Sequence, residues 1–134
     1  MRRALILVDL QHDFLPGGAL AVPDGDAVLA PAAREVESGH YDVIVATQDW
    51  HPVGHESFAS SHEGGAVGNL VQLHGLAQVL WPDHCVQGTH GAAFHPAIPM
   101  DRVDAVFQKG TDPAVDSYSG FFDNGRRNLS LIHI

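Results

Sequence analysis

Residues 4–8 read ALILV, and residues 41–47 read YDVIVAT. Both are short apolar runs rich in branched side chains, which is typical of parallel strands covered on both faces. Between them, residues 28–36 place apolar side chains at helical spacing, and Gly39 stands where a helix-ending glycine belongs. A third run, VDAVFQ at residues 103–108, predicts another strand. Strand, helix and strand in this order predict an α/β fold with a parallel sheet.

The composition describes a globular chain. Its 134 residues are 45% hydrophobic and 17% charged, which is enough for one core but short for a complete α/β enzyme. The net charge is −9, and a negative surface repels phosphate backbones, so we expect no nucleic-acid partner. No apolar run approaches the ~18 residues of a membrane span. We therefore also expect no membrane partner and a cytoplasmic location.

Residues 49–102 differ from the rest of the chain. They hold seven of the ten histidines, with little periodicity, and a long irregular stretch of this kind usually carries function. Asp49 and His51 follow the second predicted strand, and a spacing of two puts both side chains on one face of extended backbone. His84 offers a third ligand. A carboxylate and imidazoles suit zinc, iron or manganese; the alternative is a chance grouping of loop residues.

Six further histidine and glutamate side chains of this stretch are each expected to be exposed rather than to bind metal. They are His55, Glu56, His62, His74, His90 and His95.

Asp9 and Lys109 follow the first and third predicted strands. In open parallel sheets the crevice beyond the carboxyl ends of the strands binds ligands. There Asp9 can act as a general base, and Lys109 can stabilise an oxyanion or lower the pKa of a nucleophile. The alternatives are a turn-forming aspartate and a solvated surface lysine.

Cys85 is the only cysteine, so the chain can form no intrachain disulfide. It follows a candidate metal ligand and lies far in sequence from any strand-to-helix turn that would activate a thiolate. We therefore interpret it as a buried packing residue in preference to a nucleophile.

Taken together, these residues resemble the nicotinamidase branch of the isochorismatase-like hydrolases. The resemblance covers residues 1–128 and rests on five segments in a fixed order. They are LILVDLQHDFLPGGALAVPDGD (5–26), ATQDWHPVGHESFAS (46–60), LWPDHCVQGTHGAAFHP (80–96), VFQKG (106–110) and DSYSGFFDNG (116–125).

The resemblance implies a role for each matching residue. Asp9 matches the catalytic aspartate and Lys109 the catalytic lysine. The metal ligands are matched by Asp49, His51 and His84, and the aromatics that flank the pyridine ring by Phe14 and Trp81. The implied reaction is hydrolysis of nicotinamide to nicotinate and ammonia in NAD salvage, through a cysteine thioester, with one divalent transition metal. Pyrazinamide is expected to fit the same pocket.

The chain departs from the family in one respect. The family's nucleophilic cysteine lies after a further strand, in a segment resembling Ala-Thr-Asp-x-Cys, and Cys85 matches the non-catalytic cysteine beside the metal histidine instead. The complete family fold is a three-layer α/β/α sandwich around a parallel sheet. We expect residues 1–128 to be the N-terminal part of one such domain, with its C-terminal part missing, and inactive alone. Residues 129–134, LSLIHI, match a translated sequencing adaptor and are expected to be a non-native tail.

Two other functions fit the same residues. One is another amidase or isochorismatase-type hydrolase of the superfamily, whose members lack the metal ligands. The other is a non-catalytic, metal-binding fragment. Homo-oligomerisation is left open.

Overall fold

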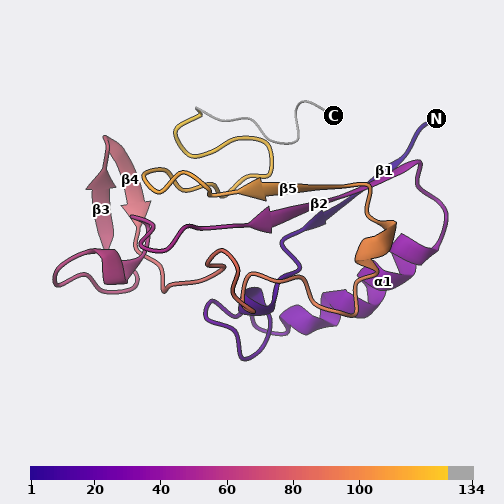
Figure 1. Cartoon of the computed structure of the whole chain (residues 1–134), viewed down its shortest axis with the longest axis horizontal. Helices are drawn as coiled ribbons and strands as arrows, with labels where there is room; N and C mark the ends of the chain where they lie inside the picture. The colour runs from indigo at the N-terminus through magenta and orange to yellow at the C-terminus, as the bar shows by residue number, and fades with distance from the viewer. Residues whose placement is uncertain (127–134) are drawn as a thin grey trace.

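The computed structural model describes residues 1–126, which form a parallel sheet with an α-helix on one face and long loops at one end (Figure 1). The strands are β1 (Ala4–Val8), β2 (Val43–Asp49), β3 (Leu70–Leu73), β4 (Leu76–Val79) and β5 (Ala105–Lys109). The helix is α1 (Leu29–Glu37), and short 3-10 helices span His12–Phe14, Gly25–Val28, Ala59–Ser61 and Met100–Arg102. The expected tail, residues 129–134, lies outside the described residues.

The main sheet has the order β1-β2-β5, and both pairings are parallel. This confirms the predicted α/β class and parallel sheet. β2 and β5 both extend beyond the predicted apolar runs, because Asp49 pairs with Lys109 across the ladder. The strands therefore end in polar residues that face each other, and these residues position the site.

The core lies between the sheet and α1. Leu29 and Val36 of the helix pack with Leu7 of β1 and Ala46 of β2 in one buried cluster. Burying one such Leu or Val side chain stabilises the fold by about 1.5–3 kcal/mol. The helix ends before Gly39, whose φ of 71° is the left-handed conformation that the sequence predicted there.

The opposite face of the sheet carries no α-helix within residues 1–126. Residues 111–126 run over part of it (Figure 1). Ile6 and Val8 of β1 point to this face and are 43% and 58% exposed. The described residues thus contain one helical layer of the predicted three-layer sandwich.

A hairpin interrupts the stretch that we expected to be irregular. β3 and β4 pair antiparallel, with Leu73 opposite Leu76. The two connecting residues, His74 and Gly75, have φ of 49° and 84°, as a type I′ turn requires. The prediction was wrong here because each strand has only four residues and His-Gly is a weak turn signal.

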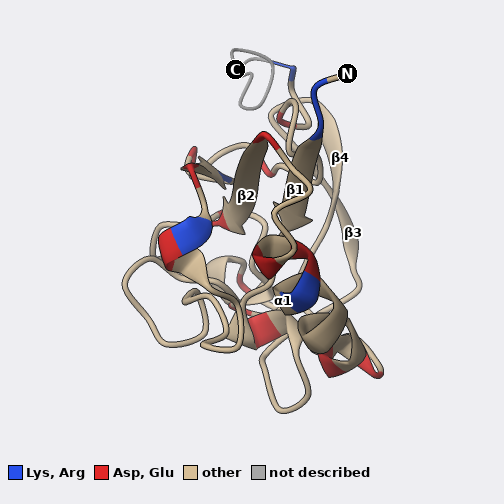
Figure 2. Ribbon diagram, turned by 90° about the vertical axis from the view of Figure 1, so that its right-hand side faces the viewer, with Lys and Arg blue, Asp and Glu red and all other residues tan. Residues whose placement is uncertain are grey.

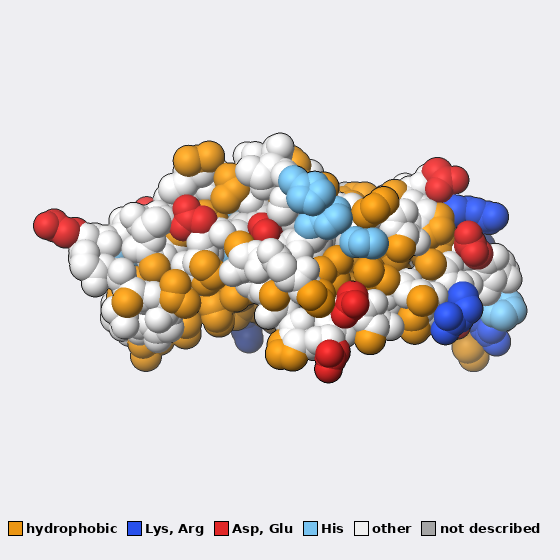
Figure 3. All heavy atoms as spheres, turned by 90° about the horizontal axis from the view of Figure 1, so that it is seen from below, with side chains coloured by type: hydrophobic (Ala, Val, Ile, Leu, Met, Phe, Trp, Pro, Cys, Tyr) orange, Lys and Arg blue, Asp and Glu red, His pale blue; other side chains and the backbone are white. Residues whose placement is uncertain are grey.

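The surface carries few basic side chains. Figure 2 shows Lys and Arg residues interspersed with Asp and Glu residues, and in the view of Figure 3 most of the visible Lys and Arg side chains lie toward one end. None of the helices within residues 1–126 combines the length and apolar character needed to cross a bilayer.

Candidate metal and catalytic site

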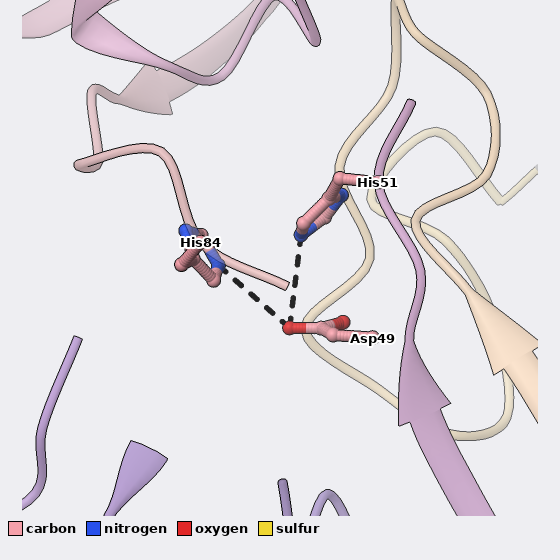
Figure 4. Close-up of side chains that lie close together, drawn as sticks. All are labelled: Asp49, His51 and His84. Carbon is pink, nitrogen blue, oxygen red and sulfur yellow. Dashed lines mark ion pairs between the residues drawn. The ribbon is translucent and has the colours of Figure 1, made fainter. Parts of the chain in front are cut away.

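Asp49, His51 and His84 converge at the carboxyl end of β2 (Figure 4). Asp49 ends the strand, His51 lies two residues further, and His84 comes from the loop after β4. The Nε2 atoms of His51 and His84 lie 3.7 and 3.8 Å from Asp49 Oδ2. These separations are too long for hydrogen bonds, so three buried ligand atoms surround one point without bonding to each other.

The second nitrogen of each imidazole is anchored by a backbone carbonyl. His51 Nδ1 donates to the carbonyl of Gly110 at 2.9 Å, and His84 Nδ1 donates to that of Pro82 at 2.8 Å. A carbonyl only accepts, so each Nδ1 carries the proton and each Nε2 presents a lone pair. His51 Nε2 is buried with no hydrogen-bond partner. An unpaired buried nitrogen beside a carboxylate is the environment that a divalent transition metal fits.

The charges of this group also suit a metal. Burial acts to raise the pKa of Asp49, but the neighbouring His51 and Lys109 side chains outweigh it and lower that pKa. Burial lowers the pKa of His84. For His51, burial acts to lower the pKa, but Asp49 outweighs it and raises that pKa. Near pH 7 the Asp49 carboxylate is therefore ionised and His84 is neutral. Because the pKa of His51 is raised, a metal ion that binds His51 competes with a proton for its nitrogen.

Lys109 connects this group to Asp9. It ends β5 opposite Asp49, and its Nζ lies 2.9 Å from Asp9 Oδ2. The same ammonium donates to Asp49 Oδ1 and, at 3.1 Å, to the carbonyl of Ser117. Burial acts to lower the pKa of Lys109, but the charges of Asp49 and Asp9 outweigh it and raise that pKa. Lys109 is therefore a buried, charged link between the two carboxylates.

Asp9 is held in an unusual backbone conformation. Its φ is 53°, in the left-handed region that non-glycine residues seldom occupy. Its Oδ1 accepts a hydrogen bond of 2.6 Å from the hydroxyl of Thr47, a fully buried residue of β2. Thr47 could not be predicted from the sequence, because a side-chain contact across 38 residues leaves no local pattern.

Phe14 and Trp81 line a cavity of about 190 Å³ next to these groups. Asp9, Lys109 and His84 contribute to the same wall. The Phe14 ring lies edge-on to His84, with centroids 5.8 Å apart. Trp81 Nε1 donates to the Tyr118 hydroxyl at 3.2 Å. Tyr118 also lines the cavity, and the sequence analysis gave it no role.

Two further residues hold the loops that carry the ligands. Gln11 is fully buried, and its amide donates to the carbonyls of Asp49 and Ala92 and accepts from the Asp49 amide. Asp13 Oδ2 accepts the backbone amide of Cys85 at 2.7 Å. Both lie in the 5–26 segment that carried the resemblance, but their partners are distant in sequence.

Cys85 is fully buried, as predicted for a packing residue. Burial, together with the charges of Asp49, Asp13 and Asp9, raises the pKa of its thiol well above the ordinary range. A neutral, inaccessible thiol is a poor nucleophile.

His55 was expected to be exposed, and this prediction was wrong. Its side chain is 1% exposed, its Nδ1 lies 2.8 Å from the Ser57 hydroxyl, and its ring lies 4.6 Å from that of His51. His55 packs against the ring of His51. It does so because the chain turns back after Pro52, where the His55 amide donates to the Pro52 carbonyl.

No protein-family model matches the chain, but individual proteins do. It is 54% identical over 132 residues to the nicotinamidase of Escherichia coli strain K12, covering 97% of this chain and 62% of that protein. The chain is therefore similar in sequence to a nicotinamidase over nearly its whole length. The yeast nicotinamidase bound to the inhibitor nicotinaldehyde superimposes on this chain with a TM-score of 0.88 at 30% identity. That match covers 96% of this chain and 66% of the yeast chain.

A second solved structure is the pyrazinamidase of Pyrococcus horikoshii in complex with zinc. It is 41% identical, with a TM-score of 0.67, and the match covers 90% of this chain and 59% of that one. The fold is shared with isochorismatase-like hydrolases. The chain spans less than two thirds of the length of these proteins.

Proposed function

We propose that this protein is a nicotinamidase, which hydrolyses nicotinamide to nicotinate and ammonia in NAD salvage. The observation that carries the proposal is the network of Asp9, Lys109 and Asp49. It joins a candidate general base, Asp9, to a candidate metal ligand, Asp49, beside a cavity lined by aromatic side chains. The homology to the Escherichia coli enzyme supports the substrate class. Pyrazinamide, which differs by one ring nitrogen, is a second expected substrate.

In this proposal Asp49, His51 and His84 hold one divalent ion of zinc, iron or manganese. The unpaired Nε2 of His51 and the ionised Asp49 support this ligand set, and the zinc complex of the related pyrazinamidase favours zinc. When bound, the ion supplies a Lewis-acid position for the pyridine nitrogen and for water. Phe14 and Trp81 flank the ring and orient its carboxamide.

Asp9 moves the protons. It takes the proton of the attacking thiol as the carbon–sulfur bond forms, and returns it to the nitrogen as ammonia leaves. It then takes a proton from water as the water oxygen attacks the thioester, and returns that proton to the sulfur as the carbon–sulfur bond breaks. The thiol is thereby regenerated, and the acid product loses its proton to solvent and departs as nicotinate. Lys109 stays protonated throughout, because two carboxylates raise its pKa. Its charge orients Asp9 and stabilises the negative charge that develops on the carboxamide oxygen.

The attacking thiol is proposed to lie outside these 134 residues. The environment of Cys85 supports this, since its thiol is buried and its pKa is raised. The chain as given is accordingly proposed to be inactive alone, and residues 1–128 to correspond to the N-terminal part of one isochorismatase-like domain. A cytoplasmic location is part of the same proposal.

A chimera tests this function. Residues 1–126 are fused to the part of the Escherichia coli nicotinamidase that the alignment leaves uncovered, and ammonia release from nicotinamide is measured. The chimera is expected to be active, and its Asp9→Asn variant to lose at least about 100-fold in turnover, as loss of a general base does. Asp42→Asn, at an exposed surface position, is the control and keeps full activity. A folded chimera without activity would contradict the proposal.

The same chimera separates the alternative functions. A metal-free amidase of the superfamily would keep its activity after dialysis against a chelator, whereas a nicotinamidase loses it and regains it with zinc. A non-catalytic metal-binding protein would bind zinc without releasing ammonia.

A further inference from the structure

A second group of histidines lies outside the proposed active site. The rings of His12 and His90 stack with centroids 4.0 Å apart, and the ring of His95 lies 5.2 Å from that of His12. Figure 3 shows histidine side chains gathered in this way on one exposed face. His90 is exposed and the other two are half-buried. The proposed nicotinamidase chemistry uses none of them. We call His12, His90 and His95 the histidine cluster.

Backbone hydrogen bonds connect the two segments that carry the histidine cluster. The His12 amide donates to the carbonyl of Ala93 at 3.1 Å, and the His95 amide donates to that of Leu10 at 2.9 Å. The Ala93 amide in turn donates to the His90 carbonyl at 3.0 Å. These bonds fix the three Cα positions relative to one another, so the rings keep their proximity without a ligand.

The histidine cluster also lines a cavity. A cavity of about 430 Å³ is lined by all three histidines together with Asp13 and Asp26. Burial, with the neighbouring His90 and His95, lowers the pKa of His12, so its imidazole is neutral and carries a free lone pair near pH 7. His95 Nδ1 accepts from the Ala97 amide at 3.1 Å, so Nδ1 holds the lone pair of this ring, and an ion would replace that hydrogen bond.

Three imidazoles with a carboxylate nearby form a donor set for zinc, nickel or copper. Among the described residues, only the Asp49 group already has three ligand atoms within 4.8 Å of one another. The rings of the histidine cluster are therefore stacked, and their nitrogen atoms are not already arranged around a common point. Its rings need to rotate about χ2, a torsion with broad, shallow preferences, to turn their nitrogens toward one point.

We propose that His12, His90 and His95 form a second binding site for a divalent transition metal, weaker than the Asp49 site. An ion there would link residues 10–13 to residues 90–95. Both segments support the first site, because Gln11 bonds Asp49 and Ala92. Occupation of the second site is therefore expected to stabilise the fold around the first.

Zinc binding by the 134-residue chain tests this site. The metal-free protein is dialysed to equilibrium against graded zinc, and bound zinc is counted by elemental analysis. Wild type is expected to bind two equivalents in two resolved steps. Asp49→Ala removes the tight step and keeps the weak one. His90→Ala and His95→Ala each abolish the weak step and keep the tight one. His40→Ala, another exposed histidine, changes neither.

A single step in wild type would overturn the proposal, as would a weak step that survives in both His90→Ala and His95→Ala. Nitrogen NMR of the histidine side chains provides a second measurement. Zinc beyond the first equivalent is expected to shift the imidazole signals of His12, His90 and His95. Shifts confined to other histidines would also overturn it. Neither result depends on nicotinamide hydrolysis, so this proposal and the proposed function fail separately.

Discussion

At the scale of single residues, Asp49 serves two sets of partners. Its Oδ1 accepts from Lys109, and its Oδ2 faces His51 and His84. Asp49→Asn keeps the shape but removes the charge. We expect it to abolish tight zinc binding and to destabilise the metal-free protein by about 2 kcal/mol, the size of a hydrogen bond to a charged group. Zinc content and urea unfolding measure the two effects. Zinc content equal to wild type would refute the ligand assignment.

Cys85 makes a second prediction at this scale. Because the thiol is fully buried and its pKa is raised, it should react with a disulfide reagent only as fast as the protein opens. The absorbance of the released thiolate follows the reaction in native buffer and in urea. We expect slow labelling in the first and rapid labelling in the second. Rapid labelling of the native protein would contradict the assignment of Cys85 as a packing residue and support it as a nucleophile.

The sequence predicted the residues at strand ends better than the residues that hold them. Asp9, Asp49 and Lys109 could be found because parallel strands bring their carboxyl ends to one crevice. Thr47 and Gln11 could not, because their roles depend on contacts across 38 residues. His55 was misjudged for the same reason, since its burial results from how its loop folds back.

At the scale of elements, β5 positions the first site through the residue that follows it. Gly110 has φ of 65°, and an added Cβ would lie 2.6 Å from His51 Nδ1. We therefore expect Gly110→Ala to displace His51 and to weaken zinc affinity by about 10–100-fold, as changes to the supports of metal ligands do. Competition with a zinc-sensitive dye measures the affinity.

The matched control is Gly64→Ala. Gly64 has φ of 69°, but an added Cβ there meets no atom within 4 Å. The control thus carries the same backbone strain without the contact. Equal zinc affinities in the two variants would show that strain, and not the approach to His51, is responsible.

The predicted elements were those with a strong local signal. β1, β2, β5 and α1 were predicted from apolar runs and helical spacing. β1 has the predicted ends, and the ends of β2 and β5 shifted by one or two residues. The β3–β4 hairpin was not, because its strands are short and half-exposed and its turn is His-Gly. The ends of β2 and β5 depend on polar pairing across the sheet, which no run of apolar residues reveals.

At the scale of the whole molecule, the buried ion pairs make stability depend on pH. The folded state lowers the pKa of Asp49 from 3.8, so its contribution is present above that value and is lost as the pH falls through the folded pKa. The folded state raises the pKa of Lys109 from 10.5, so its contribution is complete below that value and is lost as the pH rises through the folded pKa. Metal-free protein should therefore unfold more easily at both extremes.

Urea unfolding of the metal-free chain between about pH 3 and pH 11 measures this dependence. Asp49→Asn is expected to flatten the acidic limb, since its side chain does not titrate, and to reduce the alkaline limb. A variant whose profile is parallel to that of wild type would show that the ion pairs contribute nothing to stability.

We propose that Asp49, His51 and His84, with the aromatic cavity beside them, form a metal-dependent pocket for a pyridine ring. Titration of nicotinate into the chain loaded with one equivalent of zinc tests it most directly, with benzoate as the matched ligand that lacks the ring nitrogen. We predict that nicotinate binds and that benzoate binds at least about tenfold more weakly, a difference of about 1.4 kcal/mol. Zinc removal should erase the difference. Equal binding of the two acids, or a preference for nicotinate that persists without zinc, would contradict the claim.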